Sequence, residues 1–244
     1  MKDNMNLTKK ASLKKIMFNV LTILLTIVVL GGAINFYYAV GYILIPIVHE
    51  LGHYFAARFL NRKVVFGGFT PFGAYILHEN IENCKENAIV AIGGPLLGGL
   101  LGFIYYVIYW FTGETTFFVL SFISIMLNLI NLIPVKPLDG GYIAETISPI
   151  ICYLGLPFLL YLFILAKSLK GKVMLCIIFA ISIYQTYDFT KKYKNKSYFK
   201  LKRNDKIKFI SIYSILLLLL IFSALYFRSI SNCHELIKSI TRFK

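Results

Sequence analysis

The sequence contains few charged residues and few cysteines for its length. Only 15% of its 244 residues are charged and 58% are hydrophobic, whereas a soluble domain is about a quarter charged and about half apolar. This balance argues against a soluble globular protein, and recurrent apolar runs of about 20 residues predict an integral membrane protein. The cysteines are Cys84, Cys152, Cys176 and Cys233. They have no CxxC spacing, which argues against a disulfide framework or a cysteine metal site, and Cys152 and Cys176 are expected to be buried in apolar surroundings.

Acidic residues are also scarce, with 11 against 26 Lys and Arg and a formal net charge of +15. Nucleic-acid binding would explain such a charge, but the positive residues cluster between apolar segments, as the positive-inside rule requires of a membrane protein. No nucleic-acid partner is therefore expected. The densest cluster lies within residues 190–208, which we interpret as a cytoplasmic loop that sets membrane topology. Binding of anionic lipid headgroups is the alternative.

The apolar runs predict an all-α membrane protein, a polytopic bundle of about six or seven transmembrane helices. The expected spans are about 16–34, 36–60, 88–111, 116–135, 150–166, 172–189 and 209–227. The first is expected to be an uncleaved helix, with a cleaved signal sequence as the alternative. Residues 64–78 are rich in glycine, aromatic and β-branched residues. Glycines and a proline interrupt this segment too often for a transmembrane helix. It is therefore predicted to form a short membrane-associated β-hairpin or a re-entrant loop.

A short motif inside the second apolar run carries the clearest chemical signal. His49, Glu50 and His53 form the pattern H-E-x-x-H. Two histidines four residues apart lie on one helical face and can share a metal ion, and the intervening glutamate can act on a metal-bound water. A charge at the centre of a transmembrane helix costs about 2.5–3.5 kcal/mol, so these side chains are expected to face a polar interior. The nearby Arg58 places the motif toward the cytoplasmic side of the membrane.

A third metal ligand is needed, because a catalytic zinc usually has three protein ligands and a water. The best candidate is Asp139, which follows an apolar helix that is interrupted by two prolines and precedes two glycines. Irregular backbone of this kind lets a carboxylate reach a metal site, while a helix cap is the alternative. His78 is the rival ligand, although its acidic neighbours favour an exposed loop.

Together these residues resemble the site-2 proteases, a family of intramembrane zinc metalloproteases. The family's H-E-x-x-H motif is matched by His49, Glu50 and His53. Its N-x-x-P-x-x-x-L-D-G motif is matched by Asn131, Pro134, Leu138, Asp139 and Gly140. Residues 71–75 are similar to the P-x-G-G-Y stretch of the family's membrane-embedded hairpin. Gly94 and Pro95 match the start of its G-P-x-x-N motif, but Gly98 stands where asparagine is common.

The resemblance implies a minimal catalytic core at residues 36–145, without a PDZ or CBS domain. A basic segment and first helix, 1–35, would precede this core, and C-terminal helices, 146–244, would follow it. One Zn²⁺ per chain would be held by His49, His53 and Asp139, with Glu50 as the general base. The substrate-binding residues would be Asn131, Gly73 and Tyr75.

The implied reaction is hydrolysis of a peptide bond in or next to a transmembrane segment. The partners would be a single-pass membrane protein or a signal or leader peptide, together with membrane lipids. The protein would be a multi-pass protein of a cell membrane, and the Lys-, Ile- and Asn-rich composition is typical of a low-GC bacterium. The alternative is a catalytically silent relative that acts as a membrane binding or immunity protein. A metal transporter is disfavoured, because the other predicted spans offer few polar residues.

Overall fold

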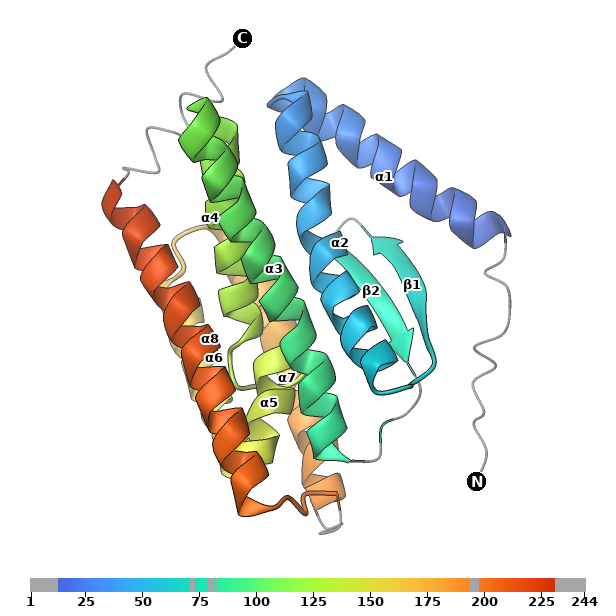
Figure 1. Cartoon of the computed structure of the whole chain (residues 1–244), viewed down its shortest axis with the longest axis vertical. Coiled ribbons are helices and arrows are strands. Elements are labelled where there is room, and N and C mark those ends of the chain that lie inside the picture. Colours follow the sequence, from blue (N-terminus) through green and yellow to red (C-terminus); the bar gives the residue numbers. More distant parts are fainter. Residues whose placement is uncertain (1–12, 71–72, 79–80, 82, 194–197, 231–244) are drawn as a thin grey trace. The chain divides into compact units, whose positions relative to one another are not determined.

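The computed structural model describes residues 13–70, 73–78, 81, 83–193 and 198–230. Within these ranges the protein is mostly helical, in agreement with the predicted all-α class (Figure 1). The helices are α1 (Leu13–Ala33), α2 (Phe36–Phe59), α3 (Cys84–Thr112), α4 (Thr115–Asn131), α5 (Asp139–Ile147), α6 (Pro149–Leu165), α7 (Leu169–Tyr193) and α8 (Arg203–Ile230). The strands β1 (Val64–Thr70) and β2 (Gly73–His78) lie between α2 and α3 in the sequence.

Each predicted span coincides with a helix, but the segment after α4 differs from the expectation. The fourth span was expected to reach about residue 135, whereas α4 ends at Asn131. Pro134 and Pro137 lack the N–H groups that would continue the helix. The additional helix α5 has nine residues. It is too short to cross a membrane. Its two glycines have low helix propensity, so propensity does not predict a helix here.

Two of the described helices are long and apolar enough to cross a membrane, over Cys84–Thr112 and Arg203–Ser229. Shorter apolar segments lie in α1, α4, α6 and α7. The second long segment, in α8, exposes large apolar side chains, among them Phe222, which is 65% exposed. The core helix of a soluble protein buries such residues, whereas a lipid-facing helix presents them outward. The number of spans stays a prediction.

The chain divides into two compact units. Unit 1 comprises residues 1–80, 93–128 and 218–244, and unit 2 comprises 81–92 and 129–217. Unit 1 therefore contains α1, α2 and both strands, and unit 2 contains α5, α6 and α7. The helices α3, α4 and α8 contribute residues to both units.

Within unit 1, polar side chains join α2 to α3 and α4. Asn35 caps α2, and its side-chain amide donates to Thr116 Oγ1 at 3.0 Å, which ties the start of α2 to the start of α4. The Tyr105 hydroxyl on α3 donates to the Gly41 carbonyl at 2.8 Å. Any Cβ at Gly41 would lie 2.3 Å from a methyl group of Leu120, so α4 also packs directly against α2. These contacts fix the rotation of α2 and hence the direction of its histidines.

The strands β1 and β2 pair antiparallel, from Val64 opposite His78 to Thr70 opposite Gly73, with an irregularity between Phe66 and Gly68. The two-stranded sheet lies beside α2 and also contacts α1 (Figure 1). Residues 71–72, part of the weaker family match, lie outside the described residues. Membrane association of this segment stays a prediction.

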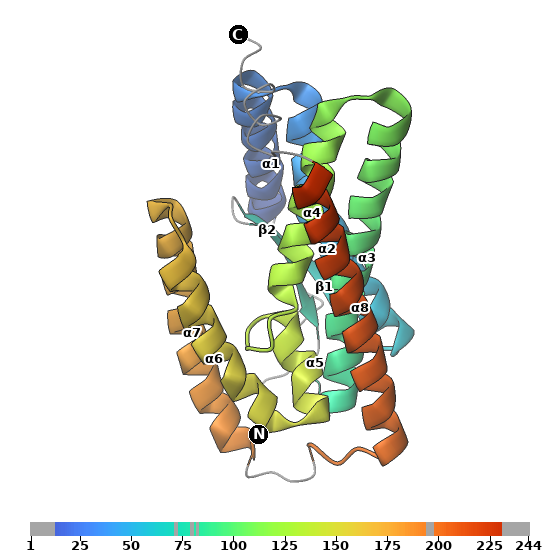
Figure 2. The ribbon, with the colours of Figure 1, turned by 90° about the vertical axis from the view of Figure 1, so that its left-hand side faces the viewer.

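In unit 2, α6 and α7 lie side by side (Figure 2). Ile133 and Val135 of the α4–α5 connection pack with Leu159 of α6 in a buried cluster. Cys152 is buried, as expected, but Cys176 is exposed. That second expectation was wrong because an apolar run does not reveal which face of its helix packs inward. Cys84 is also buried, and Cys233 lies outside the described residues.

Candidate metal centre

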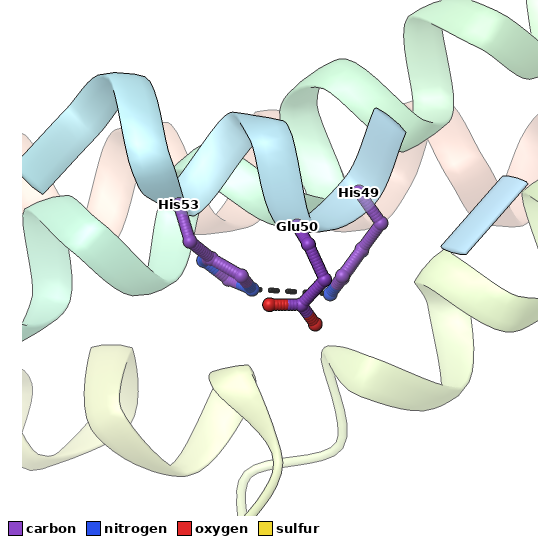
Figure 3. A group of neighbouring side chains, drawn as sticks. All are labelled: His49, Glu50 and His53. Carbon is purple, nitrogen blue, oxygen red and sulfur yellow. Dashed lines mark hydrogen bonds between the residues drawn. The ribbon is translucent and has the colours of Figure 1, made fainter. Parts of the chain in front are cut away.

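The structure brings the three residues of the H-E-x-x-H motif together on one side of α2 (Figure 3). The Nε2 atoms of His49 and His53 are 3.1 Å apart, and their ring centroids are 4.7 Å apart. One ligand atom from each histidine and from Glu50 lies within 4.8 Å of the others. His49 and His53 are 5% and 8% exposed, and Glu50 is half-buried. The motif therefore forms an inward-facing group of three metal-ligating side chains.

Glycines of α3 provide the space for this group. A Cβ at Gly52 would lie 2.0 Å from the Gly93 carbonyl oxygen, so α2 and α3 are in backbone contact there. A Cβ at Gly94 would lie 2.4 Å from Cε1 and Nε2 of His53 and 2.8 Å from Cε1 of His49. The glycine of the Gly-Pro pair thus lies against the two imidazole rings, and any side chain at this position would displace them.

Asn128 of α4 contacts the other nitrogen of His49. Its Oδ1 lies 2.8 Å from His49 Nδ1, and its Nδ2 donates to the Ser124 carbonyl at 2.7 Å. Because the carbonyl of Ser124 can only accept, the Asn128 amide must turn its oxygen toward the imidazole. His49 Nδ1 then carries the proton, and Nε2 presents its lone pair toward His53. Sequence reasoning missed Asn128, although an asparagine inside an apolar helix is itself a signal of function.

The spacing of the two histidines fits a shared zinc ion. Two nitrogens at about 2.0–2.1 Å from one tetrahedral zinc would be about 3.3 Å apart, close to the observed 3.1 Å between Nε2 atoms. The hydrogen bond at His49 Nδ1 is of the kind that orients histidine ligands. The described residues of unit 1 thus offer two imidazole ligands and a neighbouring carboxylate, and a third strong ligand would come from elsewhere in the chain.

Asp139, the predicted third ligand, is the first residue of α5 in unit 2. The N-cap is Leu138, which makes no side-chain capping bond, so the alternative interpretation of Asp139 as the cap is wrong. A Cβ at Gly140 would lie 2.1 Å from the Leu132 carbonyl oxygen. This glycine therefore lets the preceding loop fold back over the start of α5, and a carboxylate in the first turn is favoured by the helix dipole.

The predicted substrate-binding residues occupy two places. Asn131 is the partly buried last residue of α4. Gly73 and Tyr75 lie on β2, opposite Thr70 and Gly68 respectively. The rival ligand His78 ends β2 rather than lying in a loop. Its acidic neighbours at 79 and 82 lie outside the described residues.

A buried polar network holds the loop before Asp139. The Lys136 ammonium lies 2.6 Å from Glu145 Oε2 of α5, and the Tyr198 hydroxyl donates to Glu145 Oε1 at 2.7 Å. The Asn87 amide in turn donates to the Tyr198 oxygen at 2.8 Å. Burial, and then the charge of Glu145, raise the pKa of Tyr198 above its ordinary value, so the phenol stays protonated as a donor. Sequence reasoning did not predict this network, because Asn87 and Tyr198 are far from Glu145 in the chain.

The sequence is similar to those of known proteins. Residues 36–115 and 113–153 match peptidase family M50. The chain is 31% identical over 137 residues to a zinc metalloprotease of Methanocaldococcus jannaschii, covering 51% of this chain and 40% of that protein. It is 34% identical over 107 residues to stage IV sporulation protein FB of Bacillus subtilis, covering 41% of this chain and 36% of that protein. The chain therefore spans less than half the length of both relatives.

The predicted resemblance is confirmed: residues 36–153 match peptidase family M50, the site-2 protease family. The matched region contains the histidine pair, Glu50, Asn128 and Asp139. It ends before Tyr198 and α8.

Proposed function

We propose that this protein is an intramembrane zinc metalloprotease that hydrolyses a peptide bond in or next to a transmembrane segment. The observation that carries the proposal is the convergence of His49, Glu50 and His53 on one inward face of α2, in a chain with two helices apolar enough to cross a membrane. The substrate class is a single-pass membrane protein or a signal or leader peptide. The cleavage would serve regulated intramembrane proteolysis or peptide maturation.

His49, His53 and Asp139 would hold one zinc ion per chain. When bound, the metal acts as a Lewis acid that lowers the pKa of a water toward about 7 and polarises the scissile carbonyl. Glu50 accepts the proton of the attacking water and passes it to the leaving amine. Its half-buried position beside the two imidazoles suits a base that must stay close to the reacting atoms and still exchange protons.

The sheet supplies a means of binding substrate. The pairing of β1 with β2 makes a two-stranded sheet, and an extended peptide can add to the edge of such a sheet. A transmembrane helix has its carbonyls occupied by hydrogen bonds, so the substrate must unwind before attack. Gly73 and Tyr75 would bind the unwound segment, and Asn131 would position its backbone.

The reaction is tested with the purified protein in proteoliposomes that contain a single-pass substrate with a Gly-Pro pair near its cytoplasmic end. The wild type is expected to cleave it. Glu50→Gln should lower the rate about 10²–10⁴-fold at unchanged zinc content. Equal cleavage by both proteins would refute the assigned role of Glu50.

The need for unwinding gives a second prediction. A substrate whose Gly and Pro are replaced by Leu should be cleaved more slowly, because leucine stabilises its helix. Product is measured by mass spectrometry at equal substrate density in the membrane. Equal rates for the two substrates would count against helix opening as a required step.

The alternative function, a silent relative that binds membrane partners, makes the opposite prediction for the catalytic base. In a binding or immunity protein, Glu50→Gln would keep full biological activity in cells. Full loss of activity with this variant, at normal protein abundance, favours the protease.

A further inference from the structure

We propose that Asn128 of α4 is the positioning residue of His49. Its amide occupies space that is available because α3 has glycine at position 98. The inference rests on the proposed function in one respect, that His49 is a metal ligand. It adds a residue outside both sequence motifs to the metal centre.

The first support is the geometry of the Asn128 side chain, which is fully buried. Its two amide ends make different contacts: the oxygen with His49 Nδ1 at 2.8 Å, and the nitrogen with the Ser124 carbonyl at 2.7 Å. The second contact prevents the amide from flipping, because a flip would place two oxygens against each other. Asn128 therefore fixes both the ring orientation of His49 and the nitrogen that remains for a metal.

The second support is the space around Gly98, one helical turn after Gly94 on α3. A Cβ at Gly98 would lie 2.3 Å from Oδ1 and 2.5 Å from Nδ2 of Asn128. An asparagine at position 98 and the present Asn128 would therefore compete for one volume. Glycine at position 98, where the family's G-P-x-x-N motif commonly has asparagine, therefore leaves room for the Asn128 amide from α4.

The third support is the way α4 is joined to α3. The Ser124 hydroxyl donates to the Gly98 carbonyl at 2.8 Å, and the Ser121 hydroxyl donates to the Gly102 carbonyl at 2.7 Å. Both serines are fully buried. The two bonds set the rotation of α4 against α3, and this rotation directs Asn128 at His49. The orientation of a histidine on α2 thus depends on the contact between two other helices.

Loss of a hydrogen-bonding partner behind a metal-bound histidine typically lowers metal affinity about 10–100-fold. The test measures zinc affinity of the full-length protein in detergent by competition with a chromophoric chelator. Asn128→Leu, which has the same side-chain branching and no acceptor, should bind zinc about 10–100-fold more weakly than wild type. Asn128→Asp keeps an oxygen toward His49 and should bind more tightly than Asn128→Leu, provided that its second oxygen is protonated and donates to the Ser124 carbonyl.

A double variant that moves the asparagine from position 128 to position 98 distinguishes a role in orienting His49 from a role in packing alone. The pair Asn128→Ala with Gly98→Asn should regain affinity relative to Asn128→Ala alone, because it returns the amide from α3. The matched control, Asn128→Ala with Gly98→Leu, fills the volume without an acceptor and should not regain it. The absorption spectrum of the cobalt-substituted protein should change in Asn128→Ala and return toward wild type only in the exchange variant.

Equal affinity in the wild type and Asn128→Leu would overturn the inference, as would equal recovery with asparagine and leucine at position 98. If Asn128→Leu does not fold, the zinc affinities of the two double variants still test the inference, since both carry the same Asn128→Ala truncation. Absence of zinc binding by the wild type would instead refute the proposed function. The two failures are therefore distinguishable.

Discussion

Gly94 is the residue whose enlargement would disturb the histidine pair most directly. Gly94→Ala would place a methyl group 2.4 Å from His53 Nε2, so the ring must move away from its partner. We expect zinc affinity to fall about tenfold or more, as measured by chelator competition. The control is Gly99→Ala, whose methyl group would meet the flexible Leu220 side chain at 3.2 Å. Equal affinity in the two variants would show that the rings do not depend on this contact.

At the residue scale, the sequence predicts what lies within one turn of one helix. His49, Glu50 and His53 converge because their spacing alone puts them on one face, and no tertiary contact is needed to infer it. Asn128 could not be found in this way. It reaches His49 from another helix, and its role depends on the absence of a side chain at Gly98, which only three-dimensional packing can reveal.

The loop between α4 and α5 depends on a buried ion pair. The side chain of Glu145 is 0% exposed, and that of Lys136 is 11% exposed. Lys136→Met would remove the ammonium that balances this carboxylate, and such changes cost about 3–5 kcal/mol. Lys136→Met combined with Glu145→Gln should recover part of this loss in free energy of unfolding, measured by denaturant titration in detergent.

Lys85 offers a matched control for that measurement. Its ammonium lies 3.0 Å from Asp205, but its side chain is 47% exposed. Lys85→Met should therefore cost less than about 1 kcal/mol. Similar losses for Lys85→Met and Lys136→Met would contradict the argument that burial gives the Lys136–Glu145 pair its importance.

At the element scale, the long helices are predictable because apolar runs of about 20 residues have few alternatives. The short helix α5 is not, because its formation depends on contacts that the loop makes with residues far away in the chain. The Tyr213 hydroxyl of α8 donates to the Leu132 carbonyl at the start of this loop, and Tyr198 binds Glu145. Both tyrosines lie outside the region matched by the family.

The whole chain is expected to cross the membrane several times, with the basic loop at residues 190–208 in the cytoplasm. Glu114 and Lys200 are both exposed, and the predicted topology puts them on opposite sides. In a background without native cysteines, Glu114→Cys should react with a membrane-impermeant maleimide in intact cells. Lys200→Cys should react only after permeabilisation. The reverse pattern would contradict the positive-inside assignment.

At the scale of the whole molecule, composition predicts the class of protein but not its internal division. The all-α class follows from the apolar runs. The assignment of α3, α4 and α8 to two compact units does not, because hydropathy carries no information on which helices pack together. For the same reason the number of spans remains a prediction that labelling must test.

The central claim, that His49, His53 and Asp139 hold zinc, is tested most directly by metal content. Elemental mass spectrometry of detergent-purified protein compares the wild type with His53→Ala, Asp139→Ala and His78→Ala. We predict near one zinc per chain in the wild type and in His78→Ala, and loss of zinc in the other two variants. A wild type without zinc after metal reconstitution, or an Asp139→Ala variant with full zinc content and affinity, would contradict the claim.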